Sequence, residues 1–268
     1  MRDVLLIQAP YSLGREHEAL SLGPPRLAAA IGGDSVVVDR PGSSHSETAA
    51  SFEFMRALGS VVRETVEAGR FPLVLAVHCF TAVGTVGGLG RDVGVVWFDA
   101  HPDFHTPDSS PTGFLDGMGL ALLLGDGWRE ARRTVEGLQP IPAESAVLVG
   151  ARDIDPTEEP RLAASALVRA DADTLAPALD ALSSRVDAVY VHVDLDVLDP
   201  SVARVNAYAP DGGLTADELE QALAAISTRF EVAAAAMTAY DPSVDPEGKV
   251  PRIAARLAVR LASTAVPP

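Results

Sequence analysis

Short apolar runs alternate with amphipathic, helix-forming segments along almost the whole chain, and this alternation restricts the fold more than any other feature of the sequence. Each apolar run has the length and the residue types of a buried β-strand. The runs cover residues 4–8, 35–38, 72–77, 93–98, 145–149, 167–169, 188–193 and 232–237. Because a helix between two strands returns the chain to the same end of the sheet, such strands pair in parallel. The pattern therefore predicts an α/β fold in which a mainly parallel, eight-stranded sheet lies between helices on both faces.

The ends of several helices can also be read from the sequence. Ser46 has the residue type of an N-cap for a helix over residues 46–68, and Thr215 with Glu218 has the pattern of a capping box. A further helix is expected over residues 115–124. The alanine-rich run 232–237 has a helical composition, but it follows one helix and precedes an Asp-Pro turn. We therefore assign this run to the eighth strand.

The composition limits the class of protein and its partners. The chain has 268 residues, of which 47% are hydrophobic, and this fits a single α/β domain over residues 1–268. The net charge of −16 argues against nucleic acid and anionic membranes as partners, and it fits an enzyme with a small-molecule substrate. The single cysteine excludes an intrachain disulfide. No apolar run is long enough to span a bilayer, and the first residues resemble a strand rather than a signal peptide, so we expect a cytoplasmic location.

Polar side chains that can bind metals follow four of the predicted strands. They are His78 and Cys79, then Asp99, His101 and Asp103, then Asp153 and Asp155, and finally Asp194 and Asp196. Because the carboxyl ends of parallel strands meet at one edge of a sheet, we expect these side chains to lie together. Alternate residues of an extended chain face the same side, so Asp99 can converge with His101, and Asp194 with Asp196.

Carboxylates and imidazole groups in this arrangement indicate a site for divalent ions of the Mn, Fe, Co or Zn kind. So many carboxylates would repel one another unless cations neutralised them, and two ions that share carboxylates would do so. Two such ions also generate a hydroxide at neutral pH and polarise a substrate, which is a general strategy of hydrolysis. The sequence therefore predicts a binuclear, metal-dependent hydrolase.

Some of these residues also have a purely structural interpretation. Asp155 can cap the helix that follows it, and Cys79 can be a core residue, since free cysteine is commonly buried. We expect no catalytic role for His17, His45 or His192. His192 lies one step deeper along its strand than the carboxylates at the strand end, where an interior hydrogen bond can satisfy it.

Three motifs resemble those of the arginase/agmatinase family of ureohydrolases. They are residues 97–104 (Trp-Phe-Asp-Ala-His-Pro-Asp-Phe), 150–158 (Gly-Ala-Arg-Asp-Ile-Asp-Pro-Thr-Glu) and 193–201 (Val-Asp-Leu-Asp-Val-Leu-Asp-Pro-Ser). Residues 212–215 and 23–24 fit as well, so the resemblance extends over nearly the whole chain. It implies a three-layer α/β/α fold with an eight-stranded parallel sheet, a binuclear manganese centre, a homo-oligomer (trimer or hexamer) and hydrolysis of a guanidino-type C–N bond.

The resemblance also assigns metal ligands residue by residue. The matching positions are Asp99 and Asp194 as bridges, His101 and Asp196 at the second metal, and Asp103 at the first. The remaining ligand of the first metal is a histidine in the family; alignment without a gap places Cys79 there, with His78 one residue before it as the rival. The same replacement is similar to that in the N-hydroxy-arginine hydrolase branch associated with D-cycloserine biosynthesis. A thiolate favours softer ions, so Fe, Co and Zn become alternatives to manganese.

The sequence departs from the family mainly at positions that would contact the substrate. The family's proton-shuttle histidine corresponds to Asp116, which is a candidate for proton transfer, and its guanidinium-binding glutamate corresponds to Ala239. Loss of one side of a buried charge pair costs about 3–5 kcal/mol, so we expect Asp116 or Asp241 to compensate. Further candidates for substrate contact are His105, Asp155, Glu158 and Tyr208.

We therefore expect a metal-dependent hydrolase of linear amidines whose substrate is a modified guanidine, such as N-hydroxy-arginine, rather than arginine itself. The alternative is a protein of the same fold that has lost turnover and serves as a binding or regulatory subunit. The departures at Cys79, Asp116 and Ala239 motivate both hypotheses.

Overall fold

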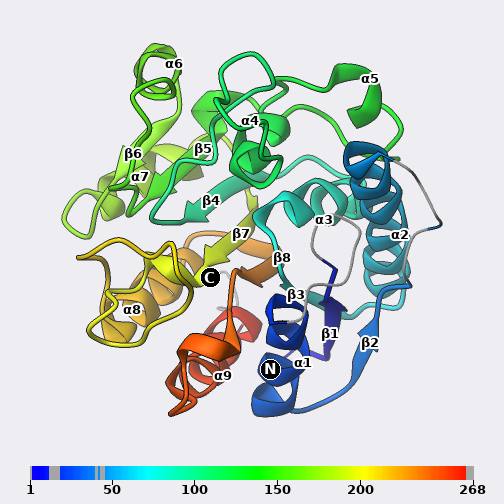
Figure 1. Ribbon diagram of the computed structural model, residues 1–268, viewed down its shortest axis with the longest axis vertical. Helices are drawn as coiled ribbons and strands as arrows, with labels where there is room; N and C mark the ends of the chain where they lie inside the picture. The colour runs from blue at the N-terminus through cyan, green and yellow to red at the C-terminus, as the bar shows by residue number, and fades with distance from the viewer. Residues whose placement is uncertain (1, 12–18, 40–41, 43–45, 264–268) are drawn as a thin grey trace.

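The computed structural model describes residues 2–11, 19–39, 42 and 46–263, so His17 and His45 lie outside the described residues. Within these ranges, eight strands form one sheet in the order β2-β1-β3-β8-β7-β4-β5-β6 (Figure 1). The strands are β1 (Val4–Ala9), β2 (Ser35–Val37), β3 (Phe71–Ala76), β4 (Gly94–Phe98), β5 (Ala146–Val149), β6 (Val168–Ala170), β7 (Ala188–Asp194) and β8 (Glu231–Thr238). The pairings between these strands are parallel, which confirms the predicted α/β fold.

Helices cover both faces of this sheet and give the protein three layers (Figure 1). They are α1 (Gly23–Ile31), α2 (Glu47–Glu67), α3 (Ala82–Leu89), α4 (Gly119–Leu123), α5 (Arg129–Arg132), α6 (Glu159–Ala164), α7 (Leu175–Ser183), α8 (Ala216–Ser227) and α9 (Lys249–Ala262). Residues of α1, α7, α8 and α9 share a core with Leu73 and Leu75, whereas residues of α2, α3 and α4 share the other core with Val74. Neighbouring residues of β3 thus face opposite layers, as the pleat requires. Among the described helices, none is long and apolar enough to cross a lipid bilayer.

The position of β8 between β3 and β7 explains why its alanine-rich sequence is extended. Ala234, Ala235 and Ala236 are fully buried, and β8 pairs in register with both neighbouring strands. Hydrogen bonds on both edges outweigh the helix preference of alanine, so the predicted eighth strand is confirmed. This strand order also places the carboxyl ends of β3, β8, β7, β4 and β5 next to one another.

Two of the predicted helix starts are confirmed by their caps. Ser46 Oγ accepts a hydrogen bond from the backbone N–H of Ala49 at the start of α2. At the start of α8, Thr215 and Glu218 form a complete capping box. Both interactions satisfy N–H groups that the first helical turn leaves without a partner.

The expected continuous helix over residues 115–124 is wrong. The chain forms a short 3₁₀ turn at Asp116–Met118 and then α4, because Gly117 has a non-helical ψ of 18°. Gly119 allows this segment to approach the turn that follows β3: a Cβ atom there would lie 3.1 Å from the ring of Trp97 and 3.3 Å from the carbonyl of Cys79. The broken helix therefore brings Asp116 close to residues 78–80.

Candidate metal centre

A cavity of about 790 Å³ opens at the carboxyl ends of the central strands. Nearly all of the residues indicated by the sequence line it: Cys79, Asp99, His101, Asp103, His105, Asp116, Asp155, Glu158, Asp194, Asp196 and Tyr208. Of the site residues expected from the sequence, Asp241 alone is not part of this lining. No lysine or arginine is among the described residues that line the cavity, so its walls carry a large excess of carboxylates.

Asp99, His101 and Asp196 form a compact group at the ends of β4 and β7. Their potential ligand atoms lie within 4.8 Å of one another, and His101 Nδ1 lies 3.4 Å from both Asp99 Oδ1 and Asp196 Oδ2. Burial raises the pKa of Asp99 to about 7. Burial also opposes protonation of His101, but the contacts with Asp196 and Asp99 outweigh it and raise the pKa of His101 to about 12. A divalent ion held by these three residues would displace the proton from His101, and the ion would then balance the charge of the two carboxylates.

Cys79 follows β3, and its thiol points toward Asp194. The distance from Cys79 Sγ is 2.8 Å to Asp194 Oδ2 and 3.1 Å to Thr238 Oγ1. Burial and then the charge of Asp194 raise the pKa of this thiol well above its ordinary value. A bound cation would reverse this effect and favour the thiolate, which is the form that binds metals. Cys79 is thus placed to be a ligand of an ion that also contacts Asp194.

Asp103 supplies a test of whether these residues fit a cation. Its Oδ2 atom is buried and has no hydrogen-bond partner among the described residues. Burial and then the charge of Asp99 raise the pKa of Asp103 well above its ordinary value. An unpaired carboxylate is costly in such surroundings, and a divalent ion would both pair with the free oxygen and neutralise the charge. The donor set therefore fits a metal centre.

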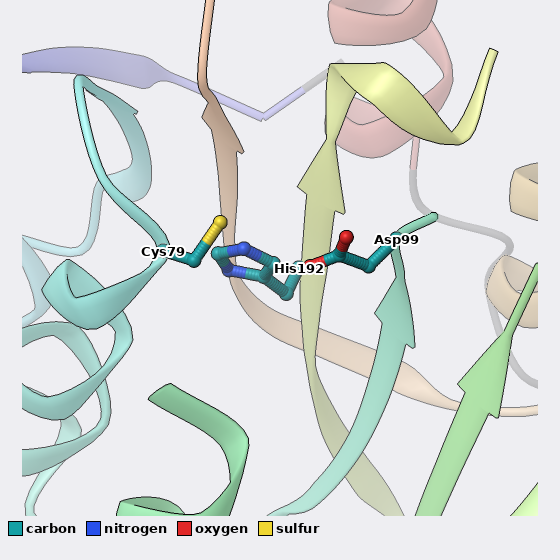
Figure 2. A group of neighbouring side chains, drawn as sticks. All are labelled: Cys79, Asp99 and His192. Atoms are coloured by element: carbon teal, nitrogen blue, oxygen red, sulfur yellow. The ribbon is translucent and has the colours of Figure 1, made fainter. Parts of the chain in front are cut away.

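His192, for which we expected no catalytic role from the sequence, lies against this group. Its ring stacks on Trp97 with a centroid separation of 3.6 Å, and it contacts Tyr190 Oη through Nδ1 at 2.8 Å. Burial lowers the pKa of His192 to about 3, so the imidazole is neutral. Potential ligand atoms of Cys79, Asp99 and His192 lie within 4.8 Å of one another (Figure 2). The signal in the sequence was the shared strand parity of His192 and Asp194.

His78, the rival of Cys79, is engaged with a different partner. Its Nδ1 atom lies 2.5 Å from Asp116 Oδ2, and the backbone N–H of Phe80 donates to Asp116 Oδ1 at 2.9 Å. Both oxygens of Asp116 are therefore held in place within the cavity lining. The contacts of Cys79 with Asp194 and of His78 with Asp116 favour Cys79 as the metal ligand.

Glu158, His105 and Asp155 lie on one wall of the cavity. Glu158 is buried, accepts a hydrogen bond from the N–H of Phe104 at 2.5 Å, and has its pKa raised to about 7 by burial. Its other oxygen lies 3.9 Å from His105 Nε2. Asp155 accepts hydrogen bonds from both the N–H and the hydroxyl of Thr157. It thus stabilises the turn before α6 but does not cap that helix, which has no side-chain cap.

The model of the arginase family matches residues 2–266 of this chain. The chain belongs to the arginase family. It is 28% identical to the arginase of Bacillus caldovelox, over 96% of this chain and 97% of that protein, and 29% identical to the arginase of Brevibacillus brevis, over 96% of each. The solved structure of the Bacillus caldovelox arginase superposes with a TM-score of 0.87 at 26% identity, covering 99% of this chain and 100% of that one.

Two of the residues expected to contact the substrate, Tyr208 and Asp241, lie at different places relative to the cavity. Tyr208 lines it and is 72% exposed, so it lies at the rim. Asp241 lies outside the lining, where its side chain accepts a hydrogen bond from the N–H of Ser243 and caps a short 3₁₀ turn. Of the two residues expected to compensate for the glutamate, the structure thus places Asp116 in the lining and Asp241 outside it, where this aspartate before proline stabilises its own turn.

Ala239, which the sequence resemblance matches to the family's glutamate, lines the cavity. Its φ of +64° is in the left-handed region, which is rare for a residue other than glycine, asparagine or aspartate. Asn206, which the sequence did not single out, donates from Nδ2 to the carbonyl of Ala239 at 3.1 Å and to Asp196 Oδ2 at 3.3 Å. Asn206 thus links the candidate metal ligand Asp196 to the turn that carries Ala239.

Proposed function

We propose that this arginase-family protein is a binuclear metal-dependent hydrolase of a guanidino or amidino C–N bond, with a modified guanidine as its substrate. The observation that carries the proposal is the convergence of buried carboxylates with His101 and Cys79 in one cavity. The carboxylates are Asp99, Asp103, Asp194 and Asp196. In the described part of the chain, His101 is the one cationic side chain within ion-pair distance of these carboxylates.

The metal-binding residues of the proposal are divided between two ions. Asp99 and Asp194 would bridge them, His101 and Asp196 would complete one site, and Cys79 with Asp103 would complete the other. Manganese is our first choice, with Fe, Co or Zn as alternatives because a thiolate favours softer ions. When bound, such a pair supplies an activated water at neutral pH and polarises the C–N carbon of the substrate.

The protein's own residues would then orient the substrate and deliver a proton. His78 and Asp116 form a hydrogen-bonded pair that lines the cavity, and the N–H of Phe80 fixes the second oxygen of Asp116. This pair can hold a proton and transfer it to the leaving amine, the role of a general acid. We expect Asp116→Asn to lower kcat about 10²- to 10³-fold with an unchanged metal content, whereas an unchanged kcat would remove the pair from the mechanism.

The preference for a modified guanidine rests on Ala239. A guanidinium keeps its positive charge at all physiological pH values and needs an anionic partner when it is buried. Position 239 offers none, and Asp241 is directed elsewhere. An N-hydroxyguanidine is a weaker base and can bind in its neutral form. Its binding free energy therefore suffers less when the anionic partner is missing.

A substrate panel with defined metals tests the proposal. The panel is arginine, N-hydroxy-arginine, agmatine, guanidinobutyrate and formiminoglutamate, each with protein loaded separately with Mn, Fe, Co or Zn. Release of urea or hydroxyurea identifies the reaction, and we expect N-hydroxy-arginine to exceed arginine. Full turnover of arginine with manganese would contradict the assigned preference.

A second candidate function is a binding or regulatory protein without turnover, and the changes at Cys79, Asp116 and Ala239 favour it because all three line the cavity. Elemental analysis separates the two. Two bound metals together with hydrolysis of any member of the panel support the enzyme. No metal uptake after reconstitution with Mn or Fe supports the binding protein.

A further inference from the structure

The side chains of Cys79, His192 and Asp99 come from three different segments and meet in the buried interior. Cys79 follows β3, His192 is in β7 and Asp99 directly follows β4; Figure 2 shows the imidazole between the thiol and the carboxylate. All three are at most 2% exposed, and their potential ligand atoms lie within 4.8 Å of one another. Bonds of about 2.0–2.3 Å to one ion place its ligands at most about 4.6 Å apart. A small closing movement is therefore enough for one ion to contact all three.

The contacts of His192 leave Nε2 as the nitrogen that faces this group. Nδ1 lies 2.8 Å from Tyr190 Oη, whereas Nε2 lies 3.3 Å from Thr238 Oγ1. The same hydroxyl lies 3.1 Å from Cys79 Sγ. When Nδ1–H donates to Tyr190, Nε2 keeps its lone pair and faces the Thr238 hydroxyl, which also contacts the thiol. Metal-bound histidines usually have this arrangement, in which the second nitrogen donates to a neighbouring group.

Trp97 holds two members of the group at once. Its ring stacks on His192 with an interplanar angle of 11°, and its Nε1–H donates to Asp99 Oδ2 at 3.0 Å. The imidazole therefore cannot rotate without leaving this stack, and the carboxylate is fixed relative to it. A rigid support of this kind is what a preorganised ligand set requires.

We propose that His192 is a ligand of the first metal, and that Cys79, His192 and Asp99 form a site selective for a thiophilic ion of the Zn, Co or Fe kind. The inference deepens the proposed function, on which it rests for the existence of a metal centre. The thiolate and the neutral imidazole are softer donors than the carboxylates, so this site binds a softer ion than manganese. The neighbouring group of Asp99, His101 and Asp196 offers mainly oxygen donors and suits manganese. The two halves of the centre, which share Asp99, therefore differ in the metal they select.

Titration of the metal-free, full-length protein with Co²⁺ tests this assignment, because a cobalt–thiolate bond gives a charge-transfer absorption band. We expect wild type to bind two Co²⁺ and to show the band, and Cys79→Ser to lose it. His192→Gln should shift the cobalt spectrum and weaken binding at the thiolate site at least about tenfold. The matched control is His78→Gln, which removes the adjacent imidazole and should leave band and affinity unchanged.

Several results would overturn the inference. One is a cobalt spectrum and affinity that do not change in His192→Gln. Another is a tenfold loss of cobalt affinity in His78→Gln instead of in His192→Gln. Thr238→Val removes the hydroxyl but no proposed ligand, so a loss of affinity as large as that of His192→Gln would identify a hydrogen-bond cluster and not a ligand set.

If His192→Gln does not fold, X-ray absorption of the His101→Gln protein with one equivalent of Zn²⁺ decides the matter. Sulfur and imidazole in the shell of that ion support the assignment, and sulfur without imidazole contradicts it. Hydrolysis of the substrate panel is scored separately. Metal binding by His192 without turnover removes the proposed function alone, and turnover without binding by His192 removes this inference alone.

Discussion

Two residues that line the cavity, Asp103 and Ala239, have a left-handed backbone, with φ of +50° and +64°. Aspartate tolerates this region, whereas a residue with an ordinary Cβ pays about 1–2 kcal/mol there. Both follow strand ends, where the chain turns sharply beside the candidate ligands. At Ala239 this conformation occurs at a position that lines the cavity, where the side chain is only a methyl group.

Ala239→Glu should change the substrate preference toward unmodified guanidinium compounds. A carboxylate at this position would pair with the charged guanidinium. Removing one partner of a buried ion pair costs about 3–5 kcal/mol. We expect kcat/KM for arginine to rise at least about tenfold, which is about 1.4 kcal/mol. Ala239→Gln is the matched control, since it has nearly the same size without the charge. Equal effects of the two variants would show that volume, not charge, sets the preference.

Glu158 should make the free energy of unfolding fall as the pH rises. Burial raises the pKa of Glu158 from 4.5 to about 7, so the folded protein binds its proton more tightly than the unfolded chain does. Stability from this group is complete at low pH and is lost as the pH rises from about 4.5 through 7. Glu158→Gln remains neutral and still accepts the N–H of Phe104, so it should lack this loss.

Urea unfolding of the metal-free protein at pH 5 and pH 8 measures the effect. At pH 8 we expect Glu158→Gln to be more stable than wild type by about 1–3 kcal/mol, and at pH 5 the difference should be smaller. A difference that does not change between the two pH values would mean that Glu158 is already ionised at pH 5.

At the scale of the elements, α2 and α3 pack unusually closely because of glycines in α3. A Cβ atom on Gly84 would lie 2.6 Å from the carbonyl oxygen of Met55 in α2, and one on Gly88 would lie 2.5 Å from the carbonyl oxygen of Gly59. The turn that carries Cys79 directly precedes α3, and both share a buried core with α2. The spacing of these glycines is visible in the sequence, but the helix that they pack against is not.

Gly84→Ala should therefore destabilise the protein, although alanine is the better helix former. In an isolated helix the change would gain about 1 kcal/mol, but the clash with the Met55 carbonyl forces α2 and α3 apart. We expect a net loss of about 1–3 kcal/mol in urea unfolding. Ser60→Ala, on the exposed side of α2, serves as control and should change stability by less than about 0.5 kcal/mol. A more stable Gly84→Ala protein would show that the two helices can separate freely.

At the scale of the whole molecule, the fold followed from the sequence because each strand is a short apolar run that is separated from the next by a helix. The same rule placed Asp99, His101, Asp194 and Asp196 at one edge. The order of the strands did not follow, because local sequence does not state which strands are neighbours. β8 lies between β3 and β7, and only that order brings Thr238 beside Cys79. The contacts of His192 with Trp97 and Thr238 therefore could not be read from its own segment.

That strand order makes metal binding a property of the whole fold. The candidate ligands follow β3, β4 and β7, which the unfolded chain does not hold together, so an ion should bind the folded state and stabilise it. Free metal at about 100 times Kd adds about 2.7 kcal/mol, which corresponds to about 5–10 °C in Tm for a chain of this size. Thermal unfolding followed by circular dichroism, before and after EDTA and after return of Mn²⁺ or Co²⁺, measures the shift. Asp196→Asn should show a smaller one, because it weakens one site and leaves the other. The contradicting result is a protein that holds two ions before EDTA treatment and unfolds at the same temperature after it. The ions would then bind the folded and the unfolded chain equally well.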